Sequence, residues 1–208
     1  RRILLHGETG AGEEDQATAR AGGMEAAKWV APIVVNIKHP KLNCGRSGGK
    51  PVPCFGQETE IQLEQLHKPG SGDAAGAFGL INLDLGETGT VGASTLGSWI
   101  TNGFDQYMPL GIYNSVPSAM FNSTHVKDAL ARRMQDTLLF PIYQSIKESG
   151  SNAEYDIVGW VGFKVSSFKA TGSEGTVRGS FTKVIWEGIQ SDTGNSMNYG
   201  TYTVQLVE

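Results

Sequence analysis

Few side chains in this sequence have the types and spacing that acid–base or nucleophilic chemistry requires. The chain has four histidines, so a Ser/His/Asp system has few bases available. His125 precedes Asp128 by three residues, which places the two side chains on one face of a helix. Histidines near helix ends also cap helices or face solvent, so this pair by itself does not establish an active site.

Two pairs of acidic residues are the other candidates for catalysis. Asp84 with Glu87, and Glu154 with Asp156, could supply the two carboxyl groups of a glycosidase. Their spacing in the sequence does not fix the distance between the carboxyl groups, and solvated strand ends or turns also explain both pairs. An exported hydrolase acting on cell-wall polymer or peptide is therefore one alternative, with His125 or an acidic pair as its working groups.

Asn82, Asp84 and Glu87 place oxygen ligands around a glycine turn, as calcium-binding loops do. The full pattern of such loops is missing, and an oxygen-rich turn is also common without an ion. These three residues are the candidate calcium ligands. A calcium- or glycan-binding adhesin module is the second alternative, and no other metal and no cofactor are expected.

Cys44 and Cys54 flank a segment rich in glycine and proline, which has little tendency to form a helix or a strand. Two cysteines this close in the chain can meet at a small entropic cost, and we predict that they form a disulfide worth roughly 2.5–3 kcal/mol. The alternatives are two free thiols or a metal site with His39 and His67. That spacing matches no common zinc pattern.

Charge and hydropathy exclude two classes of partner. Lys and Arg total 17 against 21 Asp and Glu, and residues 71–208 hold the negative excess, so a nucleic acid is not expected to bind. The longest apolar run, residues 29–37, is interrupted by Pro32 and is far too short to span a bilayer. Because the chain opens at Arg1 without Met, we expect a processed or truncated product.

Hydrophobic periodicity predicts an α+β fold. Small or apolar residues at helical spacing predict an N-terminal helix over residues 15–31, ended by Pro32, and shorter helices over 95–101 and 124–135. Asn122-Ser123-Thr124 fits the N-glycosylation sequon, but Ser123 or Thr124 is expected to cap the last helix instead. Strands are predicted over residues 33–37, 60–64, 78–85, 138–143, 157–165, 177–186 and 202–206.

These elements predict a mainly antiparallel β-sheet with the three helices packed on it and glycine-rich loops between them. Residues 60–64 alternate polar with apolar side chains, which indicates a strand at the sheet edge. Pro141 is expected at an edge or a bulge. Residues 157–165 and 177–186 are expected to form a hairpin that reverses at Gly172 and Gly175, and in the first of these strands Ile157 and Val161 should share a face.

Several motifs follow one another in an order typical of a known group. They are Gly76-Ala-Phe-Gly-Leu-Ile-Asn-Leu-Asp84, Trp99-Ile-Thr-Asn-Gly103, Leu130-Ala-Arg-Arg133, Phe140-Pro-Ile-Tyr143, Gly150-Ser-Asn-Ala-Glu-Tyr155 and Val158-Gly-Trp-Val-Gly-Phe163. In this order they resemble the extracytoplasmic regions of TadE/TadG-like proteins of bacterial Tad/Flp (tight adherence) pilus assembly.

The resemblance implies a non-enzymatic, pseudopilin-like or surface protein that works through contacts with other pilus subunits. It implies a location outside the cytoplasm, at the cell surface or anchored in the membrane by an N-terminal helix that this chain lacks. Residues 1–31 would then be a flexible segment and a membrane-proximal helix, and residues 32–208 a single extracytoplasmic domain. The group supplies no catalytic residues to transfer.

Overall fold

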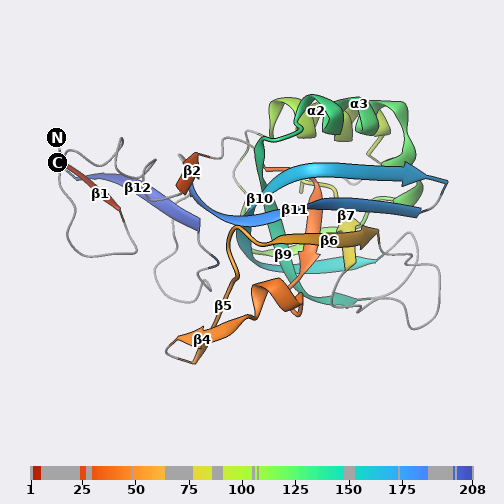
Figure 1. Cartoon of the computed structure of the whole chain (residues 1–208). Helices are drawn as coiled ribbons and strands as arrows, with labels where there is room; N and C mark the ends of the chain where they lie inside the picture. Colours follow the sequence, from red (N-terminus) through yellow and green to blue (C-terminus); the bar gives the residue numbers. More distant parts are fainter. Residues whose placement is uncertain are drawn as a thin grey trace.

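The computed structural model describes residues 2–5, 24–26, 30–47, 49–63, 77–85, 91–104, 106, 108–147, 153–172, 174–186, 199 and 201–207. Within these residues the chain is mainly β-structure with two α-helices (Figure 1). The helices are η1 (Pro40–Leu42), α2 (Ala93–Asn102), η2 (Ser118–Asn122) and α3 (Thr124–Arg132). The strands are β1 (Arg2–Leu5), β2 (Met24–Ala26), β3 (Ile33–Asn36), β4 (Gly45–Ser47), β5 (Lys50–Val52), β6 (Glu58–Leu63), β7 (Ala77–Leu80), β8 (Gly111–Asn114), β9 (Thr137–Lys147), β10 (Glu154–Thr171), β11 (Glu174–Trp186) and β12 (Thr201–Val207).

Seven strands form one mixed sheet that closes on itself. The neighbours run β11, β6, β7, β3, β9 and β10, and β10 pairs back onto β11 to complete a ring of six strands. The β3–β9 and β6–β7 pairs are parallel, and the other pairs of the ring are antiparallel. Strand β8 extends this sheet beyond β10. Strands β2 and β12 continue from β11, and β1 pairs with β12 (Figure 1).

The predicted fold class is wrong in two respects, because the sheet is mixed and the predicted N-terminal helix is absent from the described residues. Met24–Ala26 is a strand, and Val30 forms a parallel bridge to Leu139. Residues 15–23 and 27–29 lie outside the described part of the chain. The helical pattern depended mainly on alanines, which bring little hydrophobic area to a helix face, and Gly22 and Gly23 weaken a helix.

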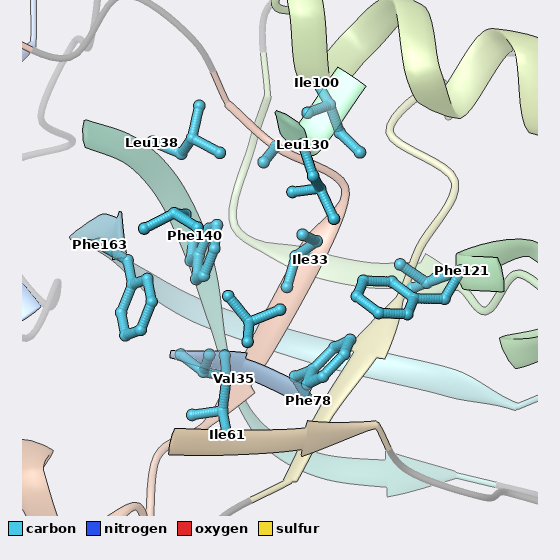
Figure 2. Close-up of a cluster of buried hydrophobic side chains, with 14 of the residues drawn as sticks. Ile33, Val35, Ile61, Phe78, Ile100, Phe121, Leu130, Leu138, Phe140 and Phe163 are labelled. Carbon is cyan, nitrogen blue, oxygen red and sulfur yellow. The ribbon is translucent and has the colours of Figure 1, made fainter. Parts of the chain in front are cut away.

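The ring encloses an inner cluster of apolar side chains. All six of its strands contribute, and α2 and α3 close the cluster with residues such as Leu96 and Val126. Figure 2 shows the centre of the inner cluster, in which the labelled residues are Ile33, Val35, Ile61, Phe78, Ile100, Phe121, Leu130, Leu138, Phe140 and Phe163. The predicted short helices therefore exist and pack on the sheet.

A second, outer cluster covers the opposite face of β3, β9 and β10. It comprises Val30, Val34, Ile81, Leu83, Met108, Tyr113, Leu139, Tyr143, Tyr155, Ile157, Trp160 and Val184. Strands β3 and β9 are buried on both faces, which explains their continuous apolar runs. The protein thus has two cores that share the same three strands.

Two register shifts let β9 and β10 serve both clusters. An extra residue lies on β9 at Gln144 and then on β10 at Val158, on either side of the pair formed by Ile157. Each extra residue reverses the faces to which the following side chains point. Tyr155 and Ile157 therefore face the outer cluster, whereas Val161 faces the inner one. The expectation that Ile157 and Val161 share a face is wrong.

Strand positions also correct two expected sheet edges. Strand β6 lies between β11 and β7, so it is not an edge strand, and β9, which contains Pro141, lies between β3 and β10. The carbonyls of Leu139 and Tyr143 accept the N–H groups of Ala31 and Ile37, at 3.0 and 2.9 Å. Pro141 lies two residues from each of them, so its backbone nitrogen also points toward β3. The pairing of β3 with β9 is interrupted there, between the Val30–Leu139 bridge and the Val35–Ile142 pair. The missing N–H of Pro141 therefore breaks no bond to β10.

The predicted β10–β11 hairpin is confirmed. Thr171 pairs with Glu174, so the reversal begins at Gly172, whose φ of +60° suits a tight turn. Gly175 lies in the strand instead, where a Cβ would stand 2.5 Å from Cδ1 of Phe121. Its lack of a side chain lets η2 pack directly on the hairpin.

Replacing Phe163 with Ala should destabilise the fold, because its ring stacks on Phe140 and meets Phe181 edge-on at the centre of the inner cluster. We expect a loss of about 3–5 kcal/mol in the free energy of unfolding, measured by urea denaturation. Lys169→Ala, at an exposed position of the same strand, should change it by less than about 0.5 kcal/mol. Equal losses in the two variants would contradict this assignment of the core.

Candidate functional site

The structure places His125 and Asp128 on the exposed side of α3. Ser123 caps this helix as predicted, since its Oγ accepts the N–H of Val126 at 3.2 Å. The amide of Asn122 in the sequon turns toward the β10–β11 reversal, where it can donate to Ala170 O and accept from Gly172 N–H, both at 2.9 Å. Ser123 therefore caps the start of α3, and Asn122 helps to pack η2 on the β10–β11 hairpin.

The acidic candidates occupy turn and strand positions. Asn82 is buried and its Oδ1 accepts the N–H of Asp84 at 2.9 Å, while its own N–H donates to Asn114 O at 2.9 Å. Glu87 lies outside the described residues. Asp156 Oδ2 accepts the Nε2 of Gln144 at 2.6 Å. In the part of the chain that the structure describes, no three His, Cys, Asp or Glu side chains gather closely enough to hold a metal ion.

The predicted disulfide between Cys44 and Cys54 is confirmed. The same segment also forms a short hairpin, β4–β5, in which Gly45 pairs with Val52. The sequence reading missed these strands, because the disulfide and the ladder together overcome the weak strand tendency of glycine and proline. With both sulfurs in one covalent bond, the alternative of a thiolate metal site with His39 is wrong. His67 lies outside the described residues.

The base of the hairpin is fixed to the inner cluster. Leu42 is buried there, and His39, which precedes η1, is also buried. His39 Nδ1 accepts the N–H of Lys41 at 3.0 Å, and the ring meets Phe181 edge-on with centroids 5.1 Å apart. Asn43 Nδ2 donates to the carbonyl of Ile37 at 2.7 Å. The hairpin therefore projects from a rigid foot (Figure 1).

The electrostatics of this foot keep His39 neutral. Burial lowers the pKa of the His39 ring to about 4, and the positive charge of Lys41 acts in the same direction. Because Nδ1 accepts a hydrogen bond from a backbone N–H, the ring proton of the neutral form resides on Nε2. His39 is thus a capping and packing residue at neutral pH.

The projecting hairpin is strongly cationic. Residues 37–57, here called the cationic hairpin, contain Lys38, Lys41, Arg46 and Lys50 and no acidic residue. The rest of the chain has 13 basic and 21 acidic residues, a net charge of −8. Lys38, Arg46 and Lys50 are exposed. Sequence reasoning missed this surface, although a window of 21 residues without a carboxylate was a visible signal.

Arg46 and Lys41 are partly oriented by neighbouring groups. Arg46 Nη1 donates to the carbonyl of Gly49 at 3.1 Å across the hairpin tip, and Lys41 Nζ donates to Gln57 Oε1 at 2.7 Å. The exposed cations are therefore held on a constrained support, which lowers the entropy lost when they bind an anionic surface. This arrangement suits binding through contact.

No protein-family model, curated protein or solved structure matches this chain. Among the described residues, no helix is long and apolar enough to cross a membrane. The cationic hairpin is the candidate functional site on its own geometry and charge.

Reducing the disulfide should lower the stability of the fold by about 3 kcal/mol, because the bond closes a short ring in the unfolded chain. Urea denaturation with and without reductant measures this loss, and intact mass reports the added hydrogens. A Cys44→Ser, Cys54→Ser variant should not respond to reductant. An unchanged denaturation midpoint of the wild type after complete reduction would contradict the prediction.

The lowered pKa of His39 predicts a pH-dependent stability. The unfolded ring binds a proton below its ordinary pKa of 6.5, whereas the folded ring resists protonation until about pH 4. Stability should therefore fall between pH 6.5 and 4, by up to about 3 kcal/mol from this group. His39→Asn, which retains a capping acceptor, should lack this part of the decline in urea denaturation, while His125→Asn at an exposed position should retain it. Parallel curves for wild type and His39→Asn would refute it.

Proposed function

We propose that this chain is a non-enzymatic extracytoplasmic component of a Tad/Flp-type pilus assembly system, acting through protein–protein contacts. The observation that carries the proposal is the ordered series of motifs that resemble TadE/TadG-like proteins. The described residues of these motifs lie in or beside β7, the end of α2, the end of α3, β9 and β10. They span elements far apart in the sequence that pack together around the two clusters.

The aromatic residues of the motifs fill positions on which the fold depends. Phe78, Phe140 and Phe163 belong to the inner cluster, and the rings of Tyr143 and Tyr155 meet edge-on in the outer one, 4.9 Å apart. Motifs that build a core in this manner support a resemblance of fold. A function based on assembly then has to reside on the remaining, exposed surface.

The disulfide supports a location outside the cytoplasm, since such bonds persist in oxidising compartments. The finer assignment, to the cell surface or to a membrane anchor, depends on the resemblance. Other pilus subunits are the proposed partners, and the cationic hairpin is the surface we assign to that contact, because it is exposed, rigidly supported and opposite in charge to the rest of the chain.

A genetic complementation experiment tests the proposal. Deleting the gene in the source bacterium should reduce pilus number and adhesion, and the wild-type gene should restore both. A variant with Arg46→Glu and Lys50→Glu should fail to restore them at equal protein levels, because the charge of the contact surface is reversed. Electron microscopy and an adhesion assay provide the readouts.

The matched control is Arg132→Glu with Lys169→Glu, which makes the same change in net charge at exposed positions outside the cationic hairpin. This control should restore pili as well as the wild type does. Normal pilus number and adhesion in the deletion strain would overturn the proposed function. Full activity of the hairpin variant would remove the hairpin from it.

A further inference from the structure

Four large apolar side chains are exposed among the described residues. Val52 lies on the cationic hairpin and is 37% exposed. Leu85, Leu110 and Ile112 are 50%, 44% and 38% exposed. Leu110 precedes β8, Ile112 lies in it, and Leu85 follows the turn in which Asn82 binds Asn114 of β8.

The outer side of β8 combines apolar and acidic groups. Ile112 pairs directly with Asp156, and Asn114 with Glu154, so these side chains share the outward face of the two strands. The intervening residues, Tyr113 and Tyr155, are buried in the outer cluster on the other face. We call this set the β8 surface; it consists of the exposed Leu85, Leu110 and Ile112 and the half-buried Glu154 and Asp156.

We propose that the cationic hairpin of one copy of this chain docks on the β8 surface of a second copy. Val52 would meet the exposed leucines and Ile112, while Arg46 and Lys50 would meet the two carboxylates. Charge favours this partner, because the cationic hairpin carries no carboxylate and the rest of the second copy has a net charge of −8.

The two surfaces lie in different parts of the molecule. The cationic hairpin follows β3, and β9 and β10 separate β3 from β8 in the sheet. The contact joins two different surfaces, so when each copy meets a different neighbour at each surface the contact can repeat along a row of subunits. This inference names the partner of the hairpin and rests on the proposed function.

The contact should be weak for an isolated domain. A projecting hairpin closed by one disulfide buries less area than a stable interface of about 1,600 Å². Lys147 on β9 lies opposite Glu154, so its positive charge offsets part of the negative charge of the β8 surface. Apolar contact then provides most of the affinity, and the charges provide orientation. We expect a dissociation constant of about 0.1–1 mM, or roughly 4–5 kcal/mol of binding free energy.

Sedimentation equilibrium of the purified chain tests the inference. The mean mass should rise with concentration, and raising the salt from about 0.05 to 0.5 M should reduce it. Arg46→Glu with Lys50→Glu, and separately Glu154→Lys with Asp156→Lys, should each weaken association at least tenfold. Val52→Ser should weaken it without altering charge. Circular dichroism establishes that each variant is folded.

Mixing the two charge-reversed variants provides the decisive measurement. The hairpin of the first is then acidic and the β8 surface of the second is basic, so the mixture should associate where each variant alone does not. A wild-type chain that stays monomeric at concentrations up to the expected dissociation constant, or a mixture that does not associate, would overturn the inference. If gene deletion abolishes pili but the purified chain is monomeric, only this inference is refuted. If the chain associates in solution but the deletion strain has normal pili, only the proposed function is refuted.

Discussion

Burial of β3, β9 and β10 on both faces is the constraint on which the rest of the structure depends. Their side chains must fill the inner cluster on one face and the outer cluster on the other. The compensating register shifts around Ile157 meet this requirement, since each shift reverses the facing of the residues that follow. The ring closes on β11 only because β10 continues past these shifts into its second pairing.

The backbones of β10 and β11 approach each other closely where these two strands pair. A Cβ on Gly162 would clash with Val184, and one on Gly179 would clash with the carbonyl of Lys164, so glycine at both positions lets β10 and β11 cross at short range. The same hairpin supplies Phe181, which holds the His39 ring at the foot of the cationic hairpin. The rigidity of the projecting surface is thus inherited from the inner cluster.

The division between buried and exposed groups agrees with the proposed function, in which the chain acts through contacts. The apolar residues of the motifs on which the proposed resemblance rests mostly belong to the two clusters. Cationic residues are concentrated on the disulfide-closed hairpin, and acidic and apolar residues meet at β8. A chain with opposite charge at separate places is suited to ordered association, because wrong orientations bring like charges together.

The sequence alone determined the features that depend on local chemistry. Proximity in the chain predicted the bond between Cys44 and Cys54, Ser123 was recognisable as a helix cap, and most strands were found from their apolar runs. The sheet order, the parallel pairs, the strand at Met24–Ala26 where a helix was expected and the reversal of facing at Val158 were decided only by tertiary structure. Those features arise from contacts between residues distant in the chain, and a periodic pattern carries no information about which strand will be its neighbour.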